Sequence, residues 1–344
     1  MADELTALQA QYPQFRIWEE KTADGQSRYV ARSIHLAGRP HTLVTADRGE
    51  LRAALAQGAE EPASMPPVTV VPNIARMYDY WVGGKDYHAV YRHAAASVAA
   101  ECPAIAQLAR ANRAFTGRAV RHLATTGISQ FIDIGAGLPE SSMVHQTASN
   151  ICPAARIAYI DNDPVVLAHA RALAARPGVT VIDGDLRDPA AILVSIDRTQ
   201  LIDLSQPTCL ILASVLHFLD PATADTAVAT LTAALPPGSY LVISAGTATG
   251  TSPAVTGRLR AAYQGGATVA ERTCDEIAGW FTGLDLLSPG LVDVCAWRPD
   301  SLWHWPTRTG ARIIGGVARK PGPDDEPIAG LRPGPDSCSD GSQI

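Results

Sequence analysis

Three aspartates mark the chemistry that this 344-residue sequence could perform. Asp133, Asp161 and Asp185 each stand at or near the end of a short apolar run, and Gly135 and Gly137 follow the first of them. Apolar runs of this length are typical of buried parallel strands, whose carboxyl ends meet at one edge of a sheet. The pattern therefore predicts a nucleotide-type ligand that is held by carboxylates at the strand ends.

The glycine loop indicates which ligand fits. Glycine lets the backbone approach a ligand closely, and a helix N-terminus behind such a loop presents free N–H groups. A dinucleotide fingerprint needs a third glycine to make room for pyrophosphate, but Leu138, Pro139 and Glu140 follow Gly137 here. S-adenosylmethionine (SAM) fits better, because it combines a cationic methionine end, a ribose diol and an adenine without any phosphate. An NAD-dependent oxidoreductase is the less favoured reading.

Each acid has an expected partner on SAM. We expect Asp133 near the cationic methionine end, Asp161 on the ribose diol and Asp185 beside the adenine amino group. The full set of expected cofactor residues is Asp133, Gly135, Gly137, Asp161, Asn162, Asp185 and Leu186.

Two histidines are candidates for catalysis. Methyl transfer from a sulfonium needs an aligned nucleophile, and a general base only where that nucleophile carries a proton of high pKa. His217 follows the fourth predicted strand on the ligand side, which makes it the best candidate base. His145, on the helix after the glycine loop, would orient the substrate. The alternative for His217 is a structural histidine that bonds to the backbone, and for His145 it is a residue that simply packs in the core.

A segment rich in aromatic and charged residues precedes the sheet. Residues 73–80 predict a helix, and Gly83 and Gly84 end it. Such a glycine pair permits a lid to close over a pocket, where aromatic side chains exclude water. An amphipathic helix followed by a turn is the alternative. The candidate lid and substrate residues are Tyr78, Trp81, Lys85, Asp86 and His88.

The elements that position these residues form an alternating pattern. Strands are predicted at residues 130–134, 156–160, 179–182, 208–214 and 240–244, with helices at 140–150, 164–175 and 222–234 between them. A helix at 275–281 and a hairpin pair at 293–297 and 312–318 complete the pattern. This alternation predicts an α/β fold with a doubly wound, Rossmann-like sheet. A further helix at 104–124 carries four arginines, most of which we expect on a solvated face.

Composition shifts divide the chain into five parts. Residues 1–60 predict a small α+β module, residues 61–71 a linker, and residues 72–128 a helical cap or lid. Residues 129–320 form the predicted SAM-binding domain, and residues 321–344 are rich in Pro, Gly, Asp and Ser, which is typical of a disordered tail.

Charge and composition exclude several classes of partner. A net charge of −6 argues against general affinity for nucleic acid or an anionic membrane, and no apolar stretch is long enough to span a bilayer. The N-terminus lacks a secretory signal pattern, and the six cysteines lie far apart without metal-ligand spacing. We therefore expect a cytoplasmic protein without a metal site, whose partner is a small-molecule substrate. The sequence leaves open a homodimer or a pathway partner protein.

The sequence resembles the class I SAM-dependent methyltransferases, and more closely an actinobacterial branch catalogued as a domain of unknown function. The resemblance covers roughly residues 72–320. It rests on residues 78–80 and 83–86, 109–115, 133–139, 159–164, 185–189, 215–218 and 297–300. It implies a seven-stranded sheet whose last strand is antiparallel, SAM at the strand tips, and a helical N-terminal cap over the substrate.

Two departures from that branch keep a second function open. The branch tends to have Asn-Val-His-Glu where this chain has Met-Val-His-Gln at residues 143–146, and often a histidine where this chain has Ala245. The first hypothesis is a SAM-dependent methyltransferase that acts on an O or N atom of a small molecule, a class that includes secondary metabolites. The alternative is a protein of this fold that does not transfer methyl, and instead serves as a binding subunit or catalyses a cyclisation or elimination in a biosynthetic pathway.

Overall fold

A computed structural model describes residues 2–13, 15–21, 27–33, 42–45, 47–59, 74–84, 89–138, 143–173, 176–250, 252–263, 269–300 and 311–325. The predicted lid residues Lys85, Asp86 and His88 lie outside these ranges. The chain divides into two compact units, Met1–Thr69 and Val70–Ile344.

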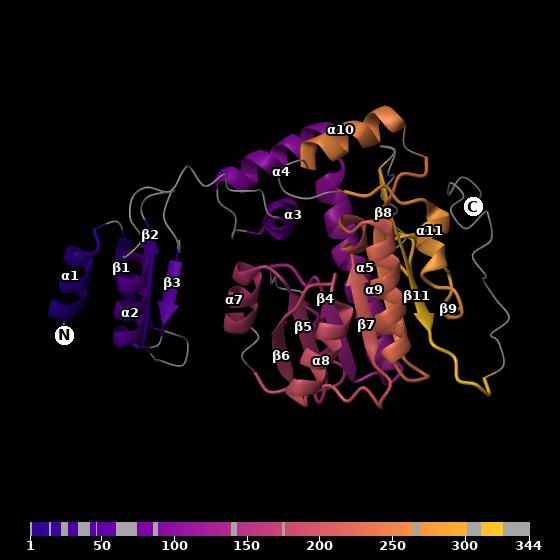
Figure 1. The fold of residues 1–344 in the computed structure, drawn as a ribbon, viewed down its shortest axis with the longest axis horizontal. Helices are drawn as coiled ribbons and strands as arrows, with labels where there is room; N and C mark the ends of the chain where they lie inside the picture. Colours follow the sequence, from indigo (N-terminus) through magenta and orange to yellow (C-terminus); the bar gives the residue numbers. More distant parts are fainter. Residues whose placement is uncertain are drawn as a thin grey trace. The chain divides into compact units, whose positions relative to one another are not determined.

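The first unit has the element order helix, three strands, helix (Figure 1). Its elements are α1 (Ala2–Gln11), β1 (Phe15–Lys21), β2 (Ser27–Ser33), β3 (Thr42–Thr45) and α2 (Arg48–Ala59). The strands form an antiparallel sheet in the order β1-β2-β3. Leu8 of α1 and Leu51 of α2 pack with Phe15 and Tyr29 of the sheet, so both helices share one small core.

The second unit is built on a mostly parallel sheet, which confirms the predicted fold class. Its strands are β4 (Gln130–Ile134), β5 (Arg156–Asp161), β6 (Val179–Asp183), β7 (Cys209–Ala213), β8 (Tyr240–Thr247), β9 (Asp285–Leu286), β10 (Val292–Asp293) and β11 (Arg312–Arg319). The order is β10-β11-β8-β7-β4-β5-β6, and β9 also pairs with β11. β4 to β8 run parallel, whereas β11 lies antiparallel to β8.

The sixth predicted strand is shorter than the sequence pattern suggested. The sequence predicted a strand over residues 293–297. In this part of the chain, the residues that pair with β11 are Val292 and Asp293 alone. The Cys295 N–H donates to the Asp293 carboxylate, and the Ala296 N–H donates to the Asp293 carbonyl, at 3.0 and 2.8 Å. These bonds turn the chain away from the sheet after β10.

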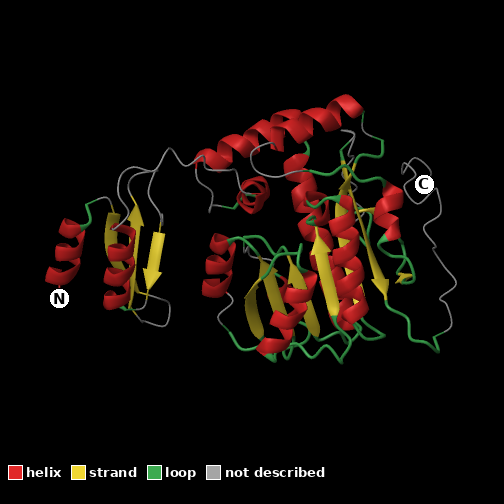
Figure 2. Ribbon diagram, viewed as in Figure 1, coloured by secondary structure: helices red, strands yellow, loops and turns green. Residues whose placement is uncertain are grey.

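Helices cover both faces of this sheet (Figure 2), and alternate residues of its parallel strands belong to two separate cores. Phe131, Ile157 and Ile211 belong to the core that α5 (Ile105–Thr125) and α6 (Val144–Ser149) complete. Their neighbours Ile132 and Leu210 face the core of α8 (Pro189–Thr199), α9 (Pro221–Ala234) and α11 (Cys274–Gly279). Both faces are therefore buried, as the continuous apolar strands predicted. α7 (Pro164–Leu173) contacts β5 and β6.

A helical cap contributes to the same unit. α3 (Ile74–Val82) contacts both α5 and α4 (Ala89–Glu101), and α10 (Pro253–Tyr263) lies beside α4 (Figure 1). α4, α8 and α10 were not predicted, although the buried residues of α8, Pro189, Ile192 and Ile196, recur at helical spacing. No helix in the described ranges combines the length and apolar character that a membrane span requires.

The cysteines differ from expectation at one position. Cys102, Cys152, Cys209 and Cys295 are free thiols. Cys274, however, is disulfide-bonded, which the expectation of a cytoplasmic protein did not include.

Candidate active site

A cavity of about 400 Å³ lies at the carboxyl ends of β4, β5, β6 and β7. All the residues expected to bind cofactor line it: Asp133, Gly135, Gly137, Asp161, Asn162, Asp185 and Leu186. The common edge of the parallel strands thus brings together residues as far apart in the sequence as Asp133 and Leu186.

Asp133 is the most deeply buried acid of this cavity. It points from β4 toward the layer of α5, and only 7% of the residue is exposed. Burial raises its pKa to about 7, and the nearby Asp161 adds to that rise, while Arg113 opposes it. A cationic ligand in the cavity would stabilise the ionised form of Asp133. Such a ligand should therefore bind more tightly at a pH at which Asp133 is charged.

Gly135 occupies a position that no other residue can take without a shift. Its φ is +73°, and a Cβ there would lie 2.1 Å from Cγ1 of Val215. The Gly135 N–H donates to the Ile160 carbonyl at 2.8 Å, which holds the loop against β5. The loop therefore keeps this edge of the cavity open to a ligand.

Asp161 ties the glycine loop to the end of β5. Its Oδ2 accepts from the Gly137 N–H and its Oδ1 from the Asp163 N–H, each at 3.0 Å. Burial raises the pKa of Asp161, and these backbone bonds act in the opposite direction. Each oxygen retains a lone pair that can accept from a ligand hydroxyl.

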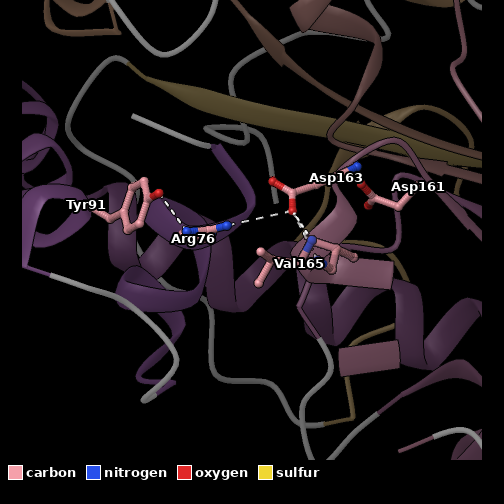
Figure 3. Close-up of polar contacts among 6 residues, drawn as sticks. Arg76, Tyr91, Asp161, Asp163 and Val165 are labelled. Atoms are coloured by element: carbon pink, nitrogen blue, oxygen red, sulfur yellow. Dashed lines mark hydrogen bonds and ion pairs between the residues drawn. The ribbon is translucent and has the colours of Figure 1, made fainter. Parts of the chain in front are cut away.

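Asp163 connects the same edge to the cap (Figure 3). Its Oδ1 accepts from the Val165 N–H at 2.6 Å, so that it caps the start of α7. Arg76 of α3 lies 3.9 Å from that oxygen and donates to the Tyr91 hydroxyl of α4 at 2.6 Å. The cap helices therefore contact the cavity edge through an ion pair that no sequence pattern indicated.

Asn162 and Asp185 form the far end of the cavity. The Asn162 amide donates to Asp185 Oδ2 at 3.1 Å, and the Arg187 N–H donates to Oδ1 at 2.9 Å. Burial alone would raise the pKa of Asp185, but these bonds and the Arg187 charge lower it below the ordinary value. Asp185 is therefore a charged acceptor at neutral pH.

Arg113 lines this cavity although the sequence placed most arginines of its helix in solvent. Its Nη2 donates to the Leu138 carbonyl at 3.3 Å, and its guanidinium lies 5.4 Å from the Tyr78 ring centre. Arg110 and Arg121 are exposed as expected. The sequence contains no signal that separates Arg113 from Arg110, because the difference comes from which side of α5 faces the sheet.

Arg118, on the same helix, is the other arginine that does not lie on the expected solvated face. It is half-buried, and its Nε and Nη2 donate to the carbonyls of Trp297 and Val294 at 2.9 and 2.6 Å. It lines neither cavity and instead holds the loop after β10 against α5.

A second cavity of about 140 Å³ adjoins the first. Tyr78, Ser214 and Phe218 line both cavities, so they form the wall between them. Trp81 and Tyr263 add two more aromatic rings to the second cavity, with ring centres 6.1 Å apart. The cap and the ends of β7 and β8 thus enclose a mostly apolar chamber beside the nucleotide-type cavity, with aromatic rings in its wall.

His217 lies in the second cavity and not in the first. The Gly246 N–H points at its Nδ1 over a long 3.4 Å, so the neutral ring carries its proton on Nε2. Burial lowers the pKa of His217 to about 4, and the charge of Arg272 acts in the same direction. His217 is therefore neutral at pH 7 and is a better hydrogen-bond donor than base.

His145 is placed away from both cavities. Only 1% of it is exposed, and its Nδ1 lies 2.9 Å from the Tyr159 hydroxyl, which also accepts from the His145 N–H at 2.8 Å. This placement corresponds to the structural alternative. Across the described ranges, no three His, Cys, Asp or Glu side chains group as metal ligands would.

Comparisons with known proteins agree with this geometry. The chain matches a family model described as S-adenosyl methyltransferase over residues 62–321. The crystal structure of a DUF574 family protein from Streptomyces avermitilis is 39% identical, with a TM-score of 0.69, over 74% of this chain and 99% of the other. That of a candidate methyltransferase from Thermobifida fusca is 36% identical, with a TM-score of 0.70, over 76% of this chain and 100% of the other. A search of curated proteins gave no match.

Proposed function

The chain belongs to the S-adenosyl methyltransferase family, and from this premise we propose that it methylates an oxygen or nitrogen atom of a small molecule held in the second cavity. The observation that carries the proposal is the shared wall. Tyr78, Ser214 and Phe218 border both chambers, so a cofactor in one and an acceptor in the other would meet there. The reaction would convert SAM and acceptor into S-adenosylhomocysteine (SAH), methylated acceptor and a proton.

The residues of the first cavity fit SAM. The buried Asp133 would pair with the ammonium group of its methionine end, and Arg113 with the carboxylate. Asp161 would accept from the ribose hydroxyls, and Asp185 with Asn162 would hold the adenine edge. Gly135 keeps the loop close to the ligand, because a Cβ there would meet Val215. SAM supplies an electrophilic methyl group when it is bound.

The residues of the second cavity would orient the acceptor. Trp81, Phe218 and Tyr263 offer flat apolar surfaces that exclude water and suit a ring. His217 would donate from Nε2 to an acceptor oxygen, which fixes the lone pair that attacks. This role replaces the general base that the sequence suggested, because Nδ1 faces the Gly246 N–H.

The reaction itself tests the proposal. Incubation with SAM and a panel of small phenols and aromatic amines should accumulate SAH in step with methylated product. Substrate conversion with SAM unconsumed would instead support the alternative of a cyclisation or elimination. SAH binding without any conversion of the panel would leave a binding subunit as the better account.

His217→Ala should weaken turnover without weakening cofactor binding. Loss of one hydrogen bond to the acceptor should lower kcat/KM by about tenfold, while the affinity for SAH stays unchanged because His217 does not line the first cavity. With a pKa of about 4, His217 should add no inflection to the rate between pH 5 and 8. An inflection near pH 6.5 that disappears in His217→Ala would contradict the donor role.

A further inference from the structure

Arg272 is a buried cation in the wall of the second cavity. Only 1% of the residue is exposed. Its carbonyl accepts from the Ala248 N–H at 2.8 Å, which anchors the backbone beside the end of β8. Its Nη2 donates to the carbonyls of Leu216 and Leu219 at 3.3 and 2.7 Å. The guanidinium therefore stands beside the turn that carries His217.

The other charged residues of this cavity are paired. Arg260 lies 3.5 Å from Glu271, and Arg312 lies 3.8 Å from Asp293. The hydrogen bonds of Arg272 go to carbonyls alone, its Nε is buried without a partner, and no carboxylate in the described part of the chain forms an ion pair with it. A buried cation without an anion is costly, so the site favours a ligand that brings negative charge.

The rest of the chamber limits the kind of anion. Aromatic rings line it (Tyr78, Trp81, Phe218 and Tyr263) together with aliphatic side chains, so the remainder of the ligand should be apolar, and a ring suits these flat surfaces. His217 also presents a donor, since the Gly246 contact leaves the ring proton on Nε2. One guanidinium carries one positive charge, which a carboxylate neutralises and which it matches in planar geometry.

We propose that the acceptor carries a carboxylate that pairs with Arg272, and that it therefore belongs to the small aromatic hydroxy or amino acids. This inference rests on the proposed function, because it assigns the second cavity to the acceptor. It makes Arg272 a specificity-determining residue, and His217 a second donor to the same ligand.

Calorimetry on the SAH complex tests the inference without requiring turnover. 4-Hydroxybenzoate and 4-hydroxybenzamide serve as probes, because they share size and shape and differ in charge. We expect the acid to bind at least about tenfold more tightly than the amide, as a charge-assisted bond would give. Equal affinities, or no binding of either probe to a protein that binds SAH, would overturn the inference. Binding of the acid without methylation would count against the proposed reaction alone.

Variants locate the preference at Arg272. Arg272→Met should remove the preference for the acid, and Arg272→Lys should keep part of it. Arg118→Met is the matched control, since Arg118 also bonds two carbonyls but lies away from the cavity, and it should keep the full preference. If Arg272→Met does not fold, the affinities of Arg272→Lys and of the wild type for the acid and the amide still test the assignment. An Arg272→Met protein that keeps the preference would contradict the assignment.

Discussion

Gly135→Ala should lower the stability of the protein and abolish measurable SAH binding. At φ +73° an alanine is strained by roughly 1–2 kcal/mol, and its Cβ would lie 2.1 Å from Cγ1 of Val215. Relief of that overlap must displace the loop or Val215, at a further cost of about 1–3 kcal/mol. Because Gly135 and Val215 both line the cofactor cavity, the displacement changes the cavity itself.

Thermal unfolding and SAH calorimetry measure the two effects. Gly137→Ala is the matched control: its φ of +65° imposes similar backbone strain, but the nearest atom to its Cβ is Arg113 Nη2 at 3.5 Å, so no clash arises. The double variant Gly135→Ala/Val215→Ala should recover part of the stability, because the clashing methyl group is gone. A Gly135→Ala protein that binds SAH within twofold of wild type would refute this account of the loop.

Asp133→Asn should weaken SAH binding and yet stabilise the free protein above neutral pH. Loss of the charge that faces the cofactor ammonium should lower the affinity by about tenfold to a hundredfold. Burial raises the folded-state pKa of Asp133 from 3.8 to about 7. The folded state therefore holds this proton more tightly than the unfolded state, so this stabilisation is fully present below about pH 4 and is lost as the pH rises from about 4 to about 7.

The pH dependence distinguishes this account from a simple loss of shape. The neutral asparagine has no such titration, so the Tm advantage of Asp133→Asn should be absent below about pH 4, grow between about pH 4 and pH 7, and level off above that. Wild-type affinity for SAH should fall as the pH drops below about 7, while that of Asp133→Asn stays flat. Asp220→Asn is the control, because Asp220 caps α9 outside both cavities and should leave SAH binding unchanged. An unchanged Tm difference from pH 5 to 8 would contradict the assignment.

The sequence by itself determined the parallel sheet and the acids at its edge. Strand periodicity is local, and parallel strands present their carboxyl ends on one side. Asp133, Asp161 and Asp185 could therefore be placed together before any coordinates. The antiparallel β11 followed from the family resemblance, and the glycine loop followed from residue types alone.

Only the tertiary structure decided which side chains complete the two cavities. Arg113 becomes half-buried, Arg272 becomes buried, and His145 leaves the site, according to how α5, α6 and the segment before α11 pack against the sheet. Those orientations depend on contacts between residues far apart in the chain, such as Arg272 with Leu216 and Leu219. A local sequence pattern fixes the period of a strand or helix. How that element is rotated against its distant partners is set by packing, and no short stretch of sequence contains that information.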